Sequence, residues 1–140
     1  MTSQPIDEIA HRRHAAEEAF RTAKAHADEL RIEHTRLVLG AAFPRHTVAI
    51  FARQWDEDQA CLVQLLTDQP GVTDIDLMND PTDGILLSEQ RRAIALADQA
   101  VILVGSDEDL WRLIGTPEVD HSDWSEFPLE LRHVAHQAAA

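Results

Sequence analysis

Residues 5–40 read PIDEIAHRRHAAEEAFRTAKAHADELRIEHTRLVLG, and this stretch is the strongest structural signal in the chain. Pro5 suits the first turn of a helix, and the acidic pair Asp7-Glu8 suits its positive N-terminal end. No further proline or glycine follows before Gly40. We therefore expect one long helix over most of residues 1–42, about 50 Å long at 1.5 Å per residue.

Apolar residues recur in this helix at alternating intervals of three and four residues, which is the spacing of a coiled-coil seam. We name the positions with this spacing the apolar stripe. Only Arg13 and His34 interrupt its apolar character. The stripe consists of Ile6, Ile9, Arg13, Ala16, Phe20, Ala23, Ala27, Leu30, His34, Leu37 and Ala41.

The stripe has two interpretations. In the first, it packs on the chain's own domain, or the helix breaks near Thr35. In the second, the chain self-associates through the stripe, because the helix is longer than the roughly 35–40 Å across which a compact chain of this size extends. The residues that we expect to carry oligomerisation are Ile9, Ala16, Phe20, Ala23, Ala27, Leu30 and Leu37.

The charge is unevenly distributed along the chain. The 140 residues include 12 Lys+Arg and 25 Asp+Glu, a formal net charge of −13, and 44% are hydrophobic, enough to bury a core. Residues 1–42 hold seven acids and six bases, whereas residues 43–140 hold eighteen acids and six bases. We therefore expect a single structural domain made of a nearly neutral packing helix and an acidic α+β body, divided after residue 42.

This charge balance excludes several partners. An acidic chain without a run of Lys or Arg repels phosphates and anionic lipids, so we expect no direct nucleic-acid binding and no membrane binding. The single cysteine, Cys61, cannot form an internal disulfide, and no apolar leader occurs. We expect a cytoplasmic protein without a cofactor, whose partners are a protein with a basic surface and a second copy in a homodimer.

The body reads as strands followed by helices. Residues 46–55, 60–67 and 72–78 are apolar runs separated by turn signals, which predicts a three-strand meander. The middle run is ambiguous, because Asp56 also suits a helix N-cap. A helix is predicted from Ser88 to about residue 98, and residues 100–104 either continue it or form a buried strand.

Two further elements follow in the sequence. Ser106 and the acids after it predict a helix that ends before Gly115. The alternation of apolar residues from Phe127 to His133 predicts an edge strand, where Pro128 is tolerated, although Leu129 to Ala140 also suits a helix.

Two folds are compatible with these elements. We expect an α+β fold in which the long N-terminal helix packs with a small antiparallel sheet, the meander, and shorter helices. The alternative is an α/β three-layer βαβαβ domain, in which residues 56–68 and 88–98 form crossover helices between parallel strands.

Paired carboxylates and imidazoles are the candidates for chemistry. Glu8 and His11, and likewise Glu130 and His133, have the Glu-x-x-His spacing with which helices supply ligands for zinc, iron or manganese. Asp74-x-Asp76 would place two carboxylates on one face of a strand. These groups support the alternative of a small metal-dependent or nucleotide-acting enzyme.

Each of the three tryptophans lies next to acids. Aromatic residues flanked by acids suit a partner that presents Arg or Lys, although large aromatics at the ends of elements also cover cores. Together with the stripe, they favour a non-catalytic acidic interaction module of the inhibitor, immunity or adaptor kind. The residues assigned to this interaction are Trp55, Asp56, Glu57, Asp58, Trp111 and Trp124.

Overall fold

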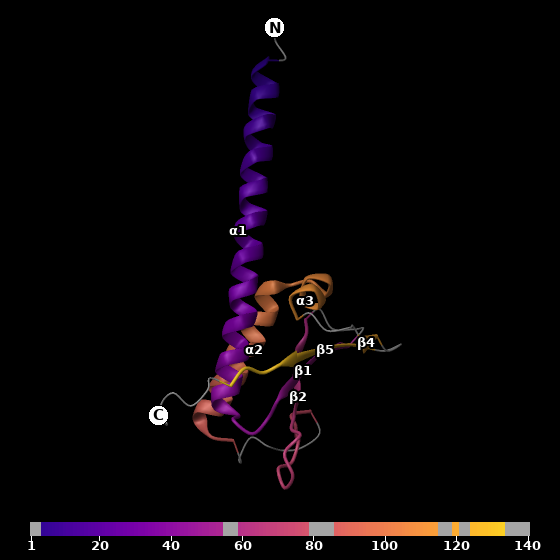
Figure 1. The fold of residues 1–140 in the computed structure, drawn as a ribbon. Helices are drawn as coiled ribbons and strands as arrows, with labels where there is room; N and C mark the ends of the chain where they lie inside the picture. The colour runs from indigo at the N-terminus through magenta and orange to yellow at the C-terminus, as the bar shows by residue number, and fades with distance from the viewer. Residues whose placement is uncertain (1–3, 55–58, 79–85, 115–118, 121–123, 134–140) are drawn as a thin grey trace.

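The long helix is present and unbroken. The computed structural model describes residues 4–54, 59–78, 86–114, 119–120 and 124–133. Its first element, α1 (Gln4–Ala42), has 39 residues and is about 58 Å long at 1.5 Å per residue. The N-terminal half of α1 extends far beyond the other elements, and its C-terminal half lies against them (Figure 1).

The break near Thr35 is absent. The Thr35 hydroxyl donates a hydrogen bond to the carbonyl oxygen of Arg31 at 2.7 Å, one turn earlier, and the helix continues to Ala42. A threonine that bonds back to its own helix in this way is tolerated inside it.

The sheet has five antiparallel strands in the order β3-β2-β1-β5-β4. The predicted meander is formed by β1 (Val48–Gln54), β2 (Cys61–Leu66) and β3 (Ile75–Asp76). On the other side of β1 lies β5 (Trp124–Glu130), which pairs in turn with β4 (Val119–Asp120). The α+β fold is therefore confirmed, and the parallel alternative is wrong because each of these pairings is antiparallel.

The prediction of an edge position for the last strand is wrong, because β5 lies between β1 and β4. The short β4 pairs only with Ser125 and Glu126. Among the described residues, no strand pairs with β5 opposite β1 beyond Glu126. Pro128, which has no N–H to donate, lies in this open part of β5 and faces Ile50 of β1.

Two helices follow the meander and cover the sheet. Of the two alternatives for residues 100–104, helix continuation is confirmed, because α2 (Ser88–Val104) includes them. The predicted third helix is α3 (Asp107–Ile114). The ends of α2 are bonded to α1: Gln90 Nε2 donates to the carbonyl oxygen of Ala42, and Lys24 Nζ to that of Val104, each at 3.2 Å. The two helices are therefore antiparallel.

The core lies between the helices and one face of the sheet. In β5, Phe127 and Leu129 are buried and alternate with more exposed residues, as expected for a strand with one covered face. They form a cluster with Phe51 of β1, Leu39 of α1 and Val101 of α2. This cluster joins the C-terminal half of α1 to the body.

Gly40 allows this close packing. A Cβ atom at Gly40 would lie 2.2 Å from the carbonyl oxygen of Arg132, so only glycine fits where the segment after β5 crosses α1. The backbone N–H of Arg132 also donates to the carbonyl oxygen of Arg36 at 3.3 Å. Gly40 is thus a contact point for this segment inside the helix.

Candidate interaction surface

The two halves of α1 have different surroundings. Every residue from position 4 to position 23 is exposed. The buried residues of the helix all lie in its second half, and they recur on one side of it. They are Asp28, Ile32, Thr35, Leu39 and Gly40.

Most of the apolar stripe does not pack on the body. Ile9, Phe20 and Leu30 are 60%, 68% and 56% exposed. At 3.6 residues per turn, Leu30 and Leu37 lie on the side of α1 opposite the buried Ile32 and Leu39. Of the residues predicted to carry oligomerisation, Ala16 and Ala23 are also exposed, and Ala27 and Leu37 are half-exposed.

A buried carboxylate with two cations lies between the stripe and the body. Asp28 is 1% exposed, and its two oxygens accept hydrogen bonds from Lys24 at 2.7 Å and Arg31 at 2.6 Å. The side chains of both cations remain about a third exposed, at 40% and 34%. One carboxylate thus serves two cations. The hydrogen bonds from Ser106 and Arg112 lower the pKa of Asp109 in α3, and the charge of Lys24 adds to this effect, so Lys24 has a second acid near it.

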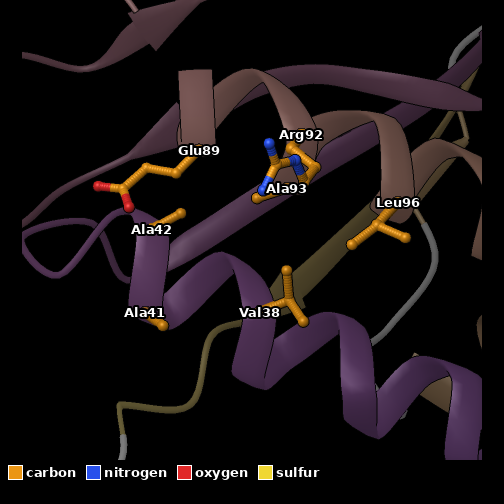
Figure 2. A pocket seen from close by; sticks show the side chains of 7 residues that line it. All are labelled: Val38, Ala41, Ala42, Glu89, Arg92, Ala93 and Leu96. Carbon is orange, nitrogen blue, oxygen red and sulfur yellow. The ribbon is translucent and has the colours of Figure 1, made fainter. Parts of the chain in front are cut away.

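A shallow apolar groove separates α1 from α2 at the base of the stripe. Its volume is about 270 Å³, and Val38 of α1 and Leu96 of α2 point toward the same space (Figure 2). Glu89 and Arg92 are the charged residues of its lining, and Ala41 belongs to both the groove and the stripe. The groove and the stripe therefore form one continuous apolar surface.

The structure does not bring the two Glu-x-x-His pairs together. Glu8 and His11 lie in the exposed half of α1, whereas Glu130 ends β5 and His133 Nε2 lies 3.4 Å from the carbonyl oxygen of Phe43. The two pairs are about 40 Å apart along the axis of α1. Among the described residues, no group of three or more His, Cys, Asp or Glu side chains is placed to hold a metal ion.

The paired aspartates have structural partners. Asp74 Oδ1 accepts the backbone N–H of Thr67 at 2.8 Å, and Asp76 Oδ1 accepts that of Met78 at 3.0 Å. Carboxylates that bond the backbone a few residues away are typical of turns. Their spacing is therefore explained by the loop before β3 and the turn after it.

The tryptophans are only partly described. Trp111 is half-buried, its indole N–H donates to the carbonyl oxygen of Glu126 at 3.4 Å, and its ring lies 5.3 Å from that of Phe127. It covers the core, and its role toward a partner stays a prediction. The segment 55–58, with Trp55, Asp56, Glu57 and Asp58, and the side chain of Trp124 lie outside the described residues.

Two polar contacts that the sequence did not reveal hold the helices to the sheet. Arg53 of β1 forms a two-pronged ion pair with Asp107 of α3, and this hydrogen bonding raises the pKa of Arg53. Asp98 of α2 accepts the backbone N–H of Leu62 in β2 at 2.7 Å. Burial raises the pKa of Asp98, and the hydrogen bond partly offsets this effect.

Comparison with known proteins finds no matching family model, curated protein or solved structure. No helix in the described part of the chain has the length and apolar character needed to cross a membrane.

The candidate interaction surface consists of the exposed stripe, the charges that flank it and the adjoining groove.

Proposed function

We propose that this chain is a non-catalytic, acidic interaction protein of the inhibitor, immunity or adaptor kind. It self-associates through α1 and presents its acidic body to a basic partner. The observation that supports this proposal is the apolar stripe, which runs along α1 and which, from residue 4 to residue 23, is covered by no described part of the chain.

An uncovered helix of this kind is costly. Most helical stability in proteins comes from packing of an apolar face, and residues 4–23 have no such packing on the body. Ile6 and Phe20 are 71% and 68% exposed. Burial of one such side chain contributes about 1.5–3 kcal/mol, so a second helix laid along the stripe would stabilise both.

The acidic body supports the second part of the proposal. The body carries a net charge of −12, and its segment from Gln54 to Gln90 contains no Lys or Arg. Within the described part of that segment, Asp68 and Asp74 are exposed. A surface of one charge sign accelerates association with a partner of the opposite sign and weakens as salt is added.

Self-association is tested by measuring molar mass by light scattering over a range of concentrations. The wild-type chain is expected to reach twice its 15.7 kDa mass as concentration rises. Phe20→Glu places a charge in the stripe and should keep the protein monomeric. Thr22→Glu adds the same charge two residues away, outside the stripe, and should leave the dimer intact. A wild-type monomer at every concentration would refute self-association.

The basic partner is tested by affinity capture from a cell extract at low and high salt. Basic proteins should be retained at low salt and released at high salt. An unrelated acidic protein of similar net charge serves as the control, and proteins that it also retains are discounted. If nothing salt-sensitive remains after this subtraction, the second part of the proposal fails.

A further inference from the structure

We propose that two copies pair through α1 in antiparallel orientation, with the two-fold axis between Phe20 and Ala23. The exposed half of each helix then lies along the body-bearing half of the other. This inference rests on the proposed self-association and specifies its geometry. Facing positions in the stripe have residue numbers that add to 43, so Phe20 of one copy packs on Ala23 of the second.

The stripe itself favours this orientation. In a parallel, in-register pair each stripe residue meets its own counterpart, so Arg13 would face Arg13 and the two guanidinium groups would repel. In the antiparallel pair Arg13 faces Leu30, where its aliphatic stem packs and its charge reaches water. Phe20 faces the small Ala23 instead of a second phenylalanine, which allows the two helices to approach closely.

The flanking charges agree with this orientation. Lys24 flanks the stripe, and 40% of its side chain remains exposed although it pairs with Asp28. In the antiparallel pair, the residue of the second copy that lies opposite Lys24 is the acid Glu17. In the parallel pair it is Ala19, so Lys24 would have no acid opposite it across the interface.

The lengths of the two surfaces also match. Residues 4–23 of one copy extend along residues 20–39 of the other, which covers the part of α1 that is exposed on all sides. Ile6 of the second copy meets Leu37, beside Val38 and the groove between α1 and α2. Stripe and flanking positions together amount to about 20 residues a side, the size of a standard protein interface.

The antiparallel pair separates the acidic bodies. Each body is joined to residues 24–42 of its own helix, so the centres of the two bodies lie toward opposite ends of the pair, about 35 Å apart along the axis. Charges at the two centres are therefore several Debye lengths apart, at about 8–10 Å per Debye length in physiological salt. A parallel pair would place two bodies of charge −12 side by side.

The orientation is tested by disulfide cross-linking in a Cys61→Ala background, with the full-length chain. Ala16 and Ala27 face each other in the antiparallel pair, because their numbers add to 43. The variant Ala16→Cys/Ala27→Cys should therefore form a covalent dimer under mild oxidation. Ala16→Cys alone should not, because its two copies lie about 16 Å apart along the axis, beyond the 4.4–6.8 Å Cα separation of a disulfide.

The outcomes separate this inference from the proposed function. A covalent dimer from Ala16→Cys alone would establish the parallel orientation and overturn the inference, while self-association would stand. If light scattering shows a dimer but neither Ala16→Cys/Ala27→Cys nor Ala16→Cys alone forms a disulfide between copies, the proposed register is refuted. A monomer by light scattering, without cross-links, would overturn both. The double variant Ala16→Cys/Thr22→Cys carries two thiols that do not face each other and should stay uncross-linked.

Discussion

The two halves of α1 form the same secondary structure for different reasons. In residues 24–42, one side of the helix is buried by α2, the sheet and the segment after β5. In residues 4–23, the described contacts are between neighbours on the helix itself, such as Arg12 with Glu8 at 3.8 Å and Arg13 with Glu17 at 3.6 Å. Exposed pairs of this kind contribute only about 0.3–0.5 kcal/mol each.

The sequence pattern of a helix and the surface that covers it are therefore separate properties. The apolar stripe is continuous over both halves, but the body packs on the other side of the second half. A helix that is buried on one side of its second half and carries an exposed apolar stripe on another side is suited to hold a body and a partner at once.

The largest effect is expected in the body-bearing half. Leu39 is 0% exposed, so Leu39→Ala should lower the free energy of unfolding by about 3 kcal/mol, as measured by urea denaturation. Leu30→Ala is the matched control, because Leu30 is 56% exposed on the stripe. In dilute protein, Leu30→Ala should lower the free energy of unfolding by less than about 0.5 kcal/mol. Equal losses in the two variants would contradict the assignment of the two sides.

The buried carboxylate on α1 should give the next largest effect. Asp28→Ala leaves Lys24 and Arg31 without their shared acceptor. It should lower the free energy of unfolding, measured by urea denaturation, by about 2 kcal/mol. Glu29→Ala removes an exposed acid one residue away and should have little effect. If both substitutions lower the free energy of unfolding equally, the buried carboxylate of Asp28 does not stabilise the fold through Lys24 and Arg31.

A smaller, pH-dependent effect is expected at Asp98, which joins α2 to β2. Asp98→Ala removes the acceptor of the Leu62 N–H and should lower the free energy of unfolding by about 1 kcal/mol. Asp98→Asn keeps an acceptor oxygen without the charge. Because burial raises the pKa of Asp98, ionisation costs the folded state more than the unfolded one.

The sign of the pH dependence follows from that raised pKa. The wild-type chain should lose stability relative to Asp98→Asn as pH rises from below the ordinary pKa of an aspartate to above the raised one. Urea denaturation of both proteins over a series of pH values between about 3.5 and 7 measures the difference. A difference that is constant or shrinks with rising pH would contradict the burial of this carboxylate.

The smallest effect on folding is expected in the exposed half. Phe20→Ala should leave the unfolding free energy of dilute protein unchanged within about 0.5 kcal/mol, because Phe20 is 68% exposed. Phe20→Ala should raise the dissociation constant of the dimer at least about tenfold, as measured by sedimentation equilibrium. The reason is that each symmetric dimer buries two Phe20 rings, one from each copy. Thr22→Ala is the control that should leave the dimer unchanged. Unaltered association of Phe20→Ala would remove the stripe from the interface.

Much of the fold could be predicted because its signals are local. The meander, the second helix and the third helix each follow from apolar runs and from cap and turn residues within about ten positions. The position of β5 in the sheet could not be predicted, because β5 pairs with β1, which lies more than seventy residues earlier in the chain. The proline in β5 pointed to an edge, but the two-residue β4 covers part of that edge.

The stripe could be predicted, whereas the side that packs on the body could not. Two of the residues that face the body, Asp28 and Thr35, are polar, so the face does not stand out as apolar in the sequence. Asp28 is buried because Lys24 and Arg31 bond both of its oxygens. The spacing of these three residues predicts helix ion pairs, but burial depends on the packing of α2 and α3 against α1, which no local pattern reveals.

Amide hydrogen exchange of residues 4–23 over a dilution series measures most directly whether a second copy covers the stripe. If a second copy covers this half of α1, its amides should be protected at concentrations where the mass is doubled. Protection should be lost on dilution, while residues 24–42 stay protected throughout. Fast exchange of residues 4–23 at every concentration would contradict the claim that a second copy covers the stripe.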